Sequence, residues 1–460
     1  MNIPYPDLTP VIPEIIMATV ASLLLLAELV ASNKRALGYI GIVVAAIAIY
    51  LLPACKGEAF GGMFINDTFS VYFKTICLIS LILTILISLK YIQVEHADFG
   101  EYYSLLLFST TGMMLMASAR DFIIVFLGIE LMSLSLYILC GIKKHDPRST
   151  EAAMKYFLLG AFSSALLLYG ISMVYGLTTS TDIYRIADYL RQTPPTLPLM
   201  LSMTLIIVAF SFKISAVPFH MWAPDVYEGA PTSITAFMST APKAAAFAVL
   251  GRIFFTAFQA FEPYWTTILI VISILTMAVG TVMAIVQTNI KRMLAYSSIA
   301  HAGYILIAIA VGGNEAMNAM KVYLLIYTFM NLGAFGIVIL LDKGENISDY
   351  NGLSKSHPYA AALMLVFMFS LAGIPPTAGF IGKFYIFMSA INAGYTWLVA
   401  IAVIFSAISA YFYLRIIMNM YMKPLGETVG ITPSLGLAAA LFISAVMIFV
   451  IGLAPSVVLF

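Results

Sequence analysis

The sequence predicts an all-helical protein embedded in a membrane, with about fourteen spanning helices and an inverted internal repeat. Its 460 residues are 62% hydrophobic and 10% charged, and its mean hydropathy is +0.99. A soluble domain carries about 25% charged residues. Many apolar runs reach the roughly 20 residues that a helix needs to cross a bilayer. We therefore expect a single multi-pass membrane domain over residues 1–460.

Fourteen apolar segments are candidates for membrane-spanning helices. They lie at residues 11–31, 36–54, 70–91, 102–118, 121–141, 152–176, 198–223, 231–258, 264–287, 293–312, 318–341, 358–390, 395–421 and 435–459. The loops between them are too short for a soluble domain. The N-terminus lacks the basic segment and cleavage site of a signal peptide, so the first segment is expected to remain as a helix.

Two spans contain prolines that would interrupt a helix in mid-membrane. Pro218 lies in the seventh span, and Pro375 and Pro376 lie in the twelfth. Proline removes a backbone hydrogen bond, and such breaks occur where protein or a water-filled cavity receives them. The breaks are five spans apart, an odd number. We therefore predict two five-helix units of opposite orientation, spans 4–8 and spans 9–13.

This repeat divides the chain into four parts. Residues 1–100 would hold three N-terminal spans, 101–260 the first repeat, 261–425 the second repeat and 426–460 the last span. Under this pairing Glu130 in span 5 corresponds to His301 in span 10. Lys213 in span 7 corresponds to the region of Lys383 in span 12. Each half would then carry a lysine on a broken helix.

Basic residues are distributed unevenly between the loops. Odd-numbered loops hold the twelve residues Lys34, Arg35, Lys90, Lys143, Lys144, Arg148, Lys291, Arg292, Lys343, Lys355, Arg415 and Lys423. Even-numbered loops hold the six residues Lys56, Arg120, Arg185, Arg191, Arg252 and Lys321. The positive-inside rule places the richer loops in the cytoplasm. Both termini would then face the outer, periplasmic side of a cell's inner membrane.

Five ionisable residues fall inside the predicted spans, namely Glu130, Lys155, Lys213, Lys243 and Lys383. Each costs roughly 2.5–3.5 kcal/mol at the centre of a spanning helix. Such residues are typical of ion and proton paths through membrane proteins. A buried ammonium loses its proton readily because desolvation disfavours the charge, and a carboxylate within about 4–6 Å reverses this effect. An ion pair that opens and closes would therefore act as a proton switch.

The sequence gives no sign of a redox or metal centre. Cys55, Cys77 and Cys140 are isolated, and no cluster of cysteine and histidine suggests an iron–sulfur or zinc site. No glycine-rich loop follows a predicted strand, so a dinucleotide site is not expected. A formal net charge of +1 gives no reason to expect nucleic acid. We expect the chain itself to hold no cofactor and no metal.

Four segments resemble the antiporter-like membrane subunits of respiratory complex I, the NADH-quinone oxidoreductase. They are DFIIVFLGIELMSLSLYIL (121–139), FKISAVPFHMWAPDVYEGAPTSITAFMSTAPKAAAFAVL (212–250), NIKRMLAYSSIAHAGYIL (289–306) and LAGIPPTAGFIGKFYIF (371–387). The resemblance is strong over spans 4–13 and looser elsewhere. The chain is most similar to the subunit N branch, because it lacks the long C-terminal lateral helix of subunit L. It also has Lys383 where subunit M usually carries a glutamate.

The resemblance implies that six residues take part in proton transfer. Glu130 and Lys213 match a paired glutamate and lysine, Lys155 a further lysine of subunit N, Lys243 the central lysine, His301 a relay histidine and Lys383 the lysine near the outlet. Subunits K and M are the implied neighbours, and membrane lipid surrounds them. NADH and quinone would be substrates of the whole complex, with FMN and iron–sulfur clusters in partner subunits.

Each of these residues also has a structural interpretation. Lys213 could form a static pair with Glu130, Lys155 could join a loop cluster with Glu151, Lys243 and Lys383 could extend to the membrane interface, and His301 could make a packing hydrogen bond. His220 could face the cavity at the Pro218 break or serve packing. Three charged residues near span ends, Glu14, Glu28 and Lys74, are expected to be interfacial anchors.

Two other functions remain open at this point. The chain could belong to a cation/proton antiporter of the Mrp type, which shares these motifs. Selection of sodium or potassium would require additional oxygen ligands, and the sequence shows no cluster of acids in mid-span. The chain could also be a scaffold whose channel is inactive, in which case removal of Lys213 would not affect pumping.

Overall fold

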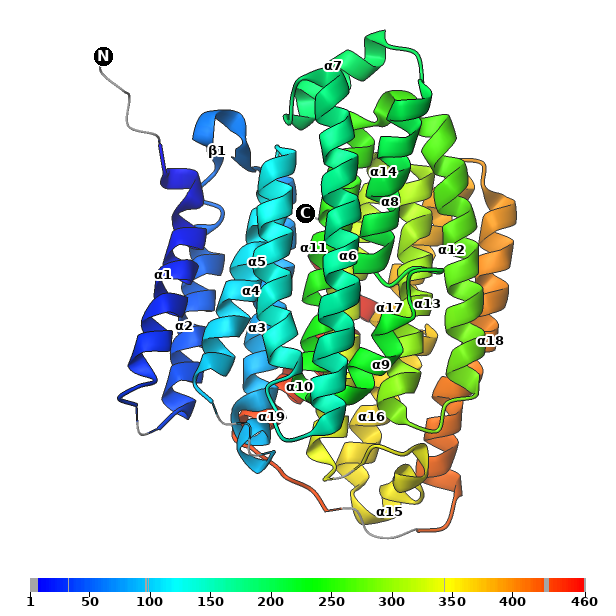
Figure 1. Cartoon of the computed structure of the whole chain (residues 1–460). Coiled ribbons are helices and arrows are strands. Elements are labelled where there is room, and N and C mark those ends of the chain that lie inside the picture. The colour runs from blue at the N-terminus through cyan, green and yellow to red at the C-terminus, as the bar shows by residue number, and fades with distance from the viewer. Residues whose placement is uncertain are drawn as a thin grey trace.

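All fourteen predicted spans are helical in the computed structural model (Figure 1). The structure describes residues 7–31, 33–95, 97, 99–342, 344–425 and 430–458. Lys343, one of the basic loop residues, lies outside them. Within the described residues, ten helices are long and apolar enough to cross a membrane, and three further apolar helices are shorter. The predicted all-helical membrane architecture is therefore confirmed.

The N-terminal unit consists of three helices and one small hairpin. Its elements are α1 (Ile12–Ala27), α2 (Arg35–Leu51), β1 (Gly57–Ala59), β2 (Phe64–Asn66) and α3 (Thr68–Val94). The two strands pair in antiparallel orientation. Asp67 caps the N-terminus of α3, because its carboxylate accepts a hydrogen bond from the Ser70 amide. α1 packs on α2 and α4, while α3 packs on the first repeat.

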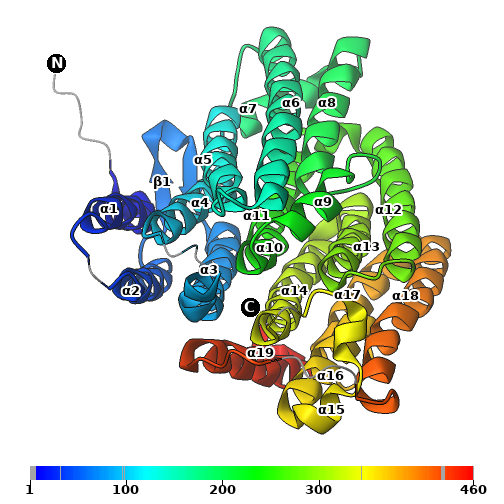
Figure 2. The same ribbon diagram turned by 60° about the horizontal axis from the view of Figure 1, so that its bottom comes forward.

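The two repeats follow one another along the chain. The first contains α4 (Glu101–Ser118), α5 (Phe122–Cys140), α6 (Pro147–Thr178), α7 (Ile183–Gln192), α8 (Leu197–Lys213), α9 (Trp222–Gly229), α10 (Thr232–Met238) and α11 (Ala241–Arg252). The second contains α12 (Glu262–Ile285), α13 (Ile290–Val311), α14 (Gly313–Leu340), α15 (Leu353–Ser356), α16 (Pro358–Ala372), α17 (Ala378–Asn392) and α18 (Thr396–Met422). The final helix, α19 (Leu435–Leu453), packs on α3, α14 and α17. Figure 2 shows α14 between the N-terminal unit and the outer helices α12 and α18.

Three spans are interrupted in mid-membrane, one more than the sequence predicts. The seventh breaks between α8 and α9, and the twelfth between α16 and α17, as expected from the prolines. Gly373 follows α16 with a φ of 86°, a left-handed conformation that glycine adopts without strain. The eighth span is also broken, by a turn at Ser239 and Thr240 between α10 and α11. The sequence analysis did not predict this third break.

Close helix pairs define the register between the repeats. A Cβ on Gly112 of α4 would lie 2.6 Å from the backbone of both Gly128 and Met132 on α5. A Cβ on Gly280 of α12 would lie 2.6 Å from the Ala300 backbone on α13, and 3.0 Å from that of Tyr296. The second set of residues, Gly280, Tyr296 and Ala300, lies 168 positions after the first set, Gly112, Gly128 and Met132.

This register changes the predicted correspondence between the two halves. Ser298 occupies the place of Glu130, and His301 occupies the place of Ser133. The expected pairing of Glu130 with His301 is therefore wrong by about one helical turn.

The loops gather at two ends of the bundle. At one end, isolated bridges join Asn289 to Asn346 and Leu341 to Ile431. We call this the basic end, because it carries the odd-numbered loops rich in lysine and arginine; it lies at the bottom of Figure 1. At the opposite end, bridges join Phe64 to Ala119 and Asp121 to Asp182. The alternation of loops that underlies the predicted orientation is thus present in the structure.

Replacing Gly112 with alanine should destabilise the protein, because the added methyl group would meet backbone atoms that cannot move aside. We expect a loss of about 1–3 kcal/mol, measured by thermal unfolding in detergent. Gly176 of α6 provides the matched control, because nothing lies within 4 Å of the position that its Cβ would take. Gly176→Ala should be neutral or stabilising by about 0.5–1 kcal/mol. Equal effects of the two substitutions would contradict close packing at Gly112.

Candidate functional site

Lys213 ends α8 at the first break and lies inside the protein. Its side chain is 7% exposed, and Nζ donates a hydrogen bond of 2.9 Å to Ser133 Oγ on α5. Glu130 lies one turn before Ser133, half-buried, and its Oε1 has no hydrogen-bond partner. No ion pair within 4 Å joins Glu130 to Lys213 in the described structure. The predicted pair is therefore open, and a neutral hydroxyl holds the lysine.

Lys243 lies in the first turn of α11, directly after the unpredicted break. Its Nζ donates to the Ser298 carbonyl at 3.0 Å and to the Ser298 hydroxyl. The residue is 3% exposed. Because the ammonium is bound to α13 in the centre of the protein, the alternative of an interfacial lysine is wrong.

His301 is the centre of a row of hydrogen bonds. Its Nδ1 is 2.7 Å from the Tyr323 hydroxyl on α14, and its Nε2 is 3.0 Å from the Tyr413 hydroxyl on α18. Tyr413 is also bonded to the Ser297 hydroxyl, one residue before the Ser298 that holds Lys243. The histidine is thus both a core residue with satisfied hydrogen bonds and a member of a row of polar side chains.

Lys383 lies on α17 beyond the third break and is 5% exposed. Its Nζ donates to the carbonyls of Leu371 and Ala372, at 3.3 and 2.9 Å, and to Ser406 Oγ at 2.9 Å. The Tyr304 ring lies 5.1 Å from the same Nζ. These carbonyls belong to the last turn of α16, where the break frees them from helix hydrogen bonds. An interfacial position for Lys383 is therefore excluded.

One face of α13 connects these groups. Ser297, Ser298, His301 and Tyr304 follow one another within two helical turns. The Tyr304 ring lies near both the His301 ring and the Lys383 ammonium. The amines of Lys243 and Lys383 thus lie at the two ends of a row of hydroxyl groups, and the imidazole of His301 lies at its centre. Such a row can pass protons between neighbours by short transfers.

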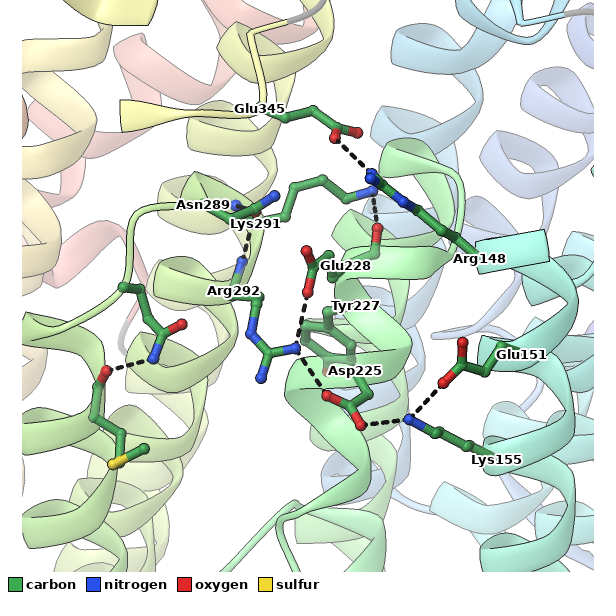
Figure 3. Close-up of polar contacts among 12 residues, drawn as sticks. Arg148, Glu151, Lys155, Asp225, Tyr227, Glu228, Asn289, Lys291, Arg292 and Glu345 are labelled. Atoms are coloured by element: carbon green, nitrogen blue, oxygen red, sulfur yellow. Dashed lines mark hydrogen bonds and ion pairs between the residues drawn. The ribbon is translucent and has the colours of Figure 1, made fainter. Parts of the chain in front are cut away.

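Lys155 does not lie in mid-membrane, contrary to expectation. Its side chain is 41% exposed, and its Nζ pairs with Glu151 and Asp225, both at 2.8 Å (Figure 3). The alternative of a loop charge cluster with Glu151 describes its surroundings correctly. Hydropathy could not reveal this, because α6 extends beyond the membrane-length segment at the basic end.

Asp225 is the hub of this ionic network at the basic end. It accepts from Lys155 of α6 and from Arg292 of α13, and Arg292 also pairs with Glu228 at 2.8 Å. Burial would raise the pKa of Asp225, but the hydrogen bonds from Lys155 and Arg292 hold it below its ordinary value. The network therefore ties the first repeat to the second, and its contribution to stability is lost only at pH below the usual aspartate range.

A buried ion pair in the N-terminal unit corrects a second expectation. Lys74 of α3 is fully buried, Glu14 of α1 is 3% exposed, and Nζ lies 2.5 Å from Glu14 Oε1. Asn66 Oδ1 accepts from the same ammonium at 2.9 Å. Lys74 and Glu14 are therefore not interfacial anchors. Glu28, by contrast, pairs with Lys34 at the end of α1, where an anchor is expected.

Several residues of the polar row were not found from the sequence. They are the hydroxyl groups of Ser133, Ser297, Ser298, Tyr323, Ser406 and Tyr413. A signal was present, because Ser133 follows Glu130 and His301 follows Ser298 by one turn within apolar spans. His220 stays unassigned, with its Nδ1 buried and without a hydrogen-bond partner.

The surface of the bundle defines the class of protein. Large apolar side chains are exposed along the outer helices, among them Leu158, Phe162 and Leu168 of α6 and Val403 and Ile404 of α18. Water would be an unfavourable neighbour for such a surface, whereas lipid suits it. Among the described residues, no group of three or more His, Cys, Asp or Glu could hold a metal ion. The fold and the buried lysines define a multi-pass, antiporter-like membrane protein.

Comparisons with known proteins show the family. Residues 119–409 match the family described as NADH:quinone oxidoreductase/Mrp antiporter, transmembrane. The chain is 50% identical to NADH-quinone oxidoreductase subunit N 1 of Thermodesulfovibrio yellowstonii, over 90% of this chain and 89% of that protein. It is also similar to NADH-quinone oxidoreductase subunit N of Trichlorobacter lovleyi, with 46% identity over 98% of this chain and 96% of that protein. The chain belongs to the subunit N family of NADH-quinone oxidoreductases.

A solved structure supports the same assignment. A chain of respiratory complex I from Thermus thermophilus superimposes with a TM-score of 0.83 and 33% identity, covering 97% of this chain and 98% of that one.

Lys155→Gln should leave proton translocation and assembly nearly unchanged. The side chain is partly exposed and its ion pairs are screened by solvent, so we expect a change in unfolding free energy within about 1 kcal/mol. Proton translocation by the assembled complex in vesicles is the measurement. A loss of pumping as large as that of a buried lysine variant would restore Lys155 to the proton path.

Replacing Glu14 alone with leucine should destabilise the protein by about 3–5 kcal/mol, because it leaves the Lys74 charge buried without a counter-ion. Lys74→Met alone should cost a similar amount. The double variant Glu14→Leu, Lys74→Met should recover most of the loss, because it buries no charge. Thermal unfolding of all three variants measures the coupling, and additive losses would contradict it.

Proposed function

We propose that this chain carries protons across the membrane as a subunit of NADH-quinone oxidoreductase. One observation carries the proposal: three buried lysines each lie beside a helix break and are held by neutral oxygen atoms. These oxygens are Ser133 Oγ for Lys213, Ser298 for Lys243, and two carbonyls and Ser406 for Lys383. Lysines held in this way can release and regain a proton, whereas arginine stays charged.

Proton movement would begin with the Glu130 and Lys213 pair. When Glu130 approaches, its carboxylate favours the charged form of Lys213, which then holds a proton. When the pair opens, as in this structure, Lys213 can pass the proton to a neutral Lys243. The N–H bond at Lys213 breaks as one forms at Lys243, and one positive charge moves with it.

The second half of the path would run along α13. From Lys243 the proton would pass through the hydroxyl groups of Ser298, Ser297 and Tyr413 to His301, and then to Lys383. Histidine suits this role because each of its two ring nitrogens can bind or release a proton. Moving one charge across the membrane against 100 mV costs about 2.3 kcal/mol, so the energy must come from partner subunits.

The partners would be other subunits of respiratory complex I. The solved relative belongs to such a complex, and we propose subunits K and M as the direct neighbours. NADH and quinone would react elsewhere in the complex, with FMN and iron–sulfur clusters in partner subunits. This chain would supply the proton path and no redox centre.

The uneven charge of the two ends supports an orientation. We propose that the basic end faces the cytoplasm, in agreement with the positive-inside rule, and that the chain lies in the cell's inner membrane. Both termini would then face the outer side.

The alternative function, that of an Mrp-type antiporter subunit, also has a relative among the solved structures. A chain of the Mrp complex from Dietzia sp. has a TM-score of 0.82 but 21% identity, so the likeness shows the fold alone. The described residues offer no cluster of carboxylates for a metal cation. The subunit N relatives therefore favour the proton-translocating subunit of the oxidoreductase.

Lys213→Arg should abolish most pumping while preserving assembly. Arginine keeps a donor for Ser133 but cannot release its proton, and we expect the ratio of protons to electrons to fall at least about tenfold. The measurement is acidification of vesicles during NADH-driven quinone reduction. Lys423→Arg, at an exposed site on the basic end, is the matched control. Unchanged pumping in Lys213→Arg and Lys213→Ala would indicate an inactive scaffold.

A further inference from the structure

A charged cavity of about 450 Å3 lies at the basic end, where the two repeats meet. Side chains and loops from α3, α6, α9, α13 and the segment after α14 contribute to it. Its volume could hold several water molecules, at about 30 Å3 each. The charged residues that line the cavity together with Lys291 are Glu95, Lys143, Asp146, Arg148, Glu228, Asp342 and Glu345.

Lys291 differs from the other cations of this cavity. Lys143 pairs with Glu95, and Arg148 pairs with Glu345. Lys291 is 3% exposed, and its Nζ donates instead to the carbonyls of Glu228 and Ala230, at 2.6 and 2.8 Å. Figure 3 shows Lys291 beside Glu228. No carboxylate of the described residues lies within 4 Å of it. Like the three lysines of the path, it is held at a helix interruption by neutral oxygens.

The same face of α13 leads from Lys291 to Lys243. Ser298, which holds Lys243, lies seven residues after Lys291, two turns and about 10 Å along the helix. Asn331 of α14 reaches this region, because its side-chain amide donates to Ser239 at the break before α11. Asn331 Oδ1 is buried without a hydrogen-bond partner. This free oxygen can bind water near the break that leads to Lys243.

We infer that Lys291 takes up protons from the basic-end cavity and passes them to Lys243, as a second input that each transport cycle needs in addition to the one through Glu130 and Lys213. This inference rests on the proposed proton-translocating function. An N–H bond at the Lys291 ammonium breaks and an N–H bond forms at a neutral Lys243. A proton from the bulk solution, relayed through O–H bonds of water in the cavity, then binds to the neutral Lys291 amine. The input enters at the interface between the two repeats, where Asp225 and Arg292 also join them.

A purely structural role for Lys291 makes a different prediction. If the ammonium only satisfies the carbonyls between α9 and α10, arginine should replace it, because arginine also donates and stays charged. If Lys291 carries protons, arginine should preserve assembly and fail in transfer. Lys291→Arg therefore separates the two roles.

The test compares variants of the whole complex in vesicles, with protons counted per electron transferred. We expect Lys291→Arg and Asn331→Leu each to lower this ratio at least threefold, while the exposed Lys144→Arg stays at the wild-type value. Wild-type pumping by Lys291→Arg would overturn the inference. Should that variant fail to assemble, wild-type pumping by Asn331→Leu would overturn it instead.

Lys243→Arg serves as the reference in the same experiment. If it lowers pumping and Lys291→Arg does not, the second input is wrong and the proposed function stands. If neither Lys243→Arg nor Lys213→Arg changes pumping, the proposed function itself fails.

Discussion

The need to solvate an ammonium group inside a lipid-embedded protein governs the structure. A membrane helix uses its own carbonyls for internal hydrogen bonds, so it offers few to a buried lysine. The Ser298 carbonyl of α13, which accepts from Lys243, is an exception. Each break releases such groups or brings a hydroxyl close. Leu371 and Ala372 provide carbonyls to Lys383, and Glu228 and Ala230 provide them to Lys291. The same breaks that weaken the helices therefore make the lysines tolerable.

α13 joins the two halves into one polar row. It presents Lys291 near the basic end, then Ser298 beside Lys243, and then His301 between two tyrosines. Because the helix is almost entirely buried, its polar groups find partners only in neighbouring helices. The Asp225 network fixes the position of its first turn against the first repeat through Arg292. Movement of α9 would consequently shift the polar groups that α13 contributes to the row.

The fold could be predicted from the sequence because the features that determine it are mainly local. Apolar run length locates the spans, and Pro218 and Pro375 mark two of the three breaks. The third break, at Ser239 and Thr240, has no proline within it and depends on packing. The positions of Lys213, Lys243 and Lys383 followed from their place in apolar spans.

Contacts between distant segments could not be predicted in the same way. Hydropathy alone could not separate a lysine of the protein interior from Lys155, whose helix extends past the apolar segment. The Glu14–Lys74 pair joins two helices 60 residues apart, so only their packing reveals it. The central claim is that buried lysines of this chain change protonation during turnover. Infrared difference spectroscopy of the complex, with isotopically labelled lysine in this chain alone, tests it directly. We predict lysine bands that appear on NADH addition and vanish in Lys243→Arg; their absence in the active wild-type complex would contradict the claim.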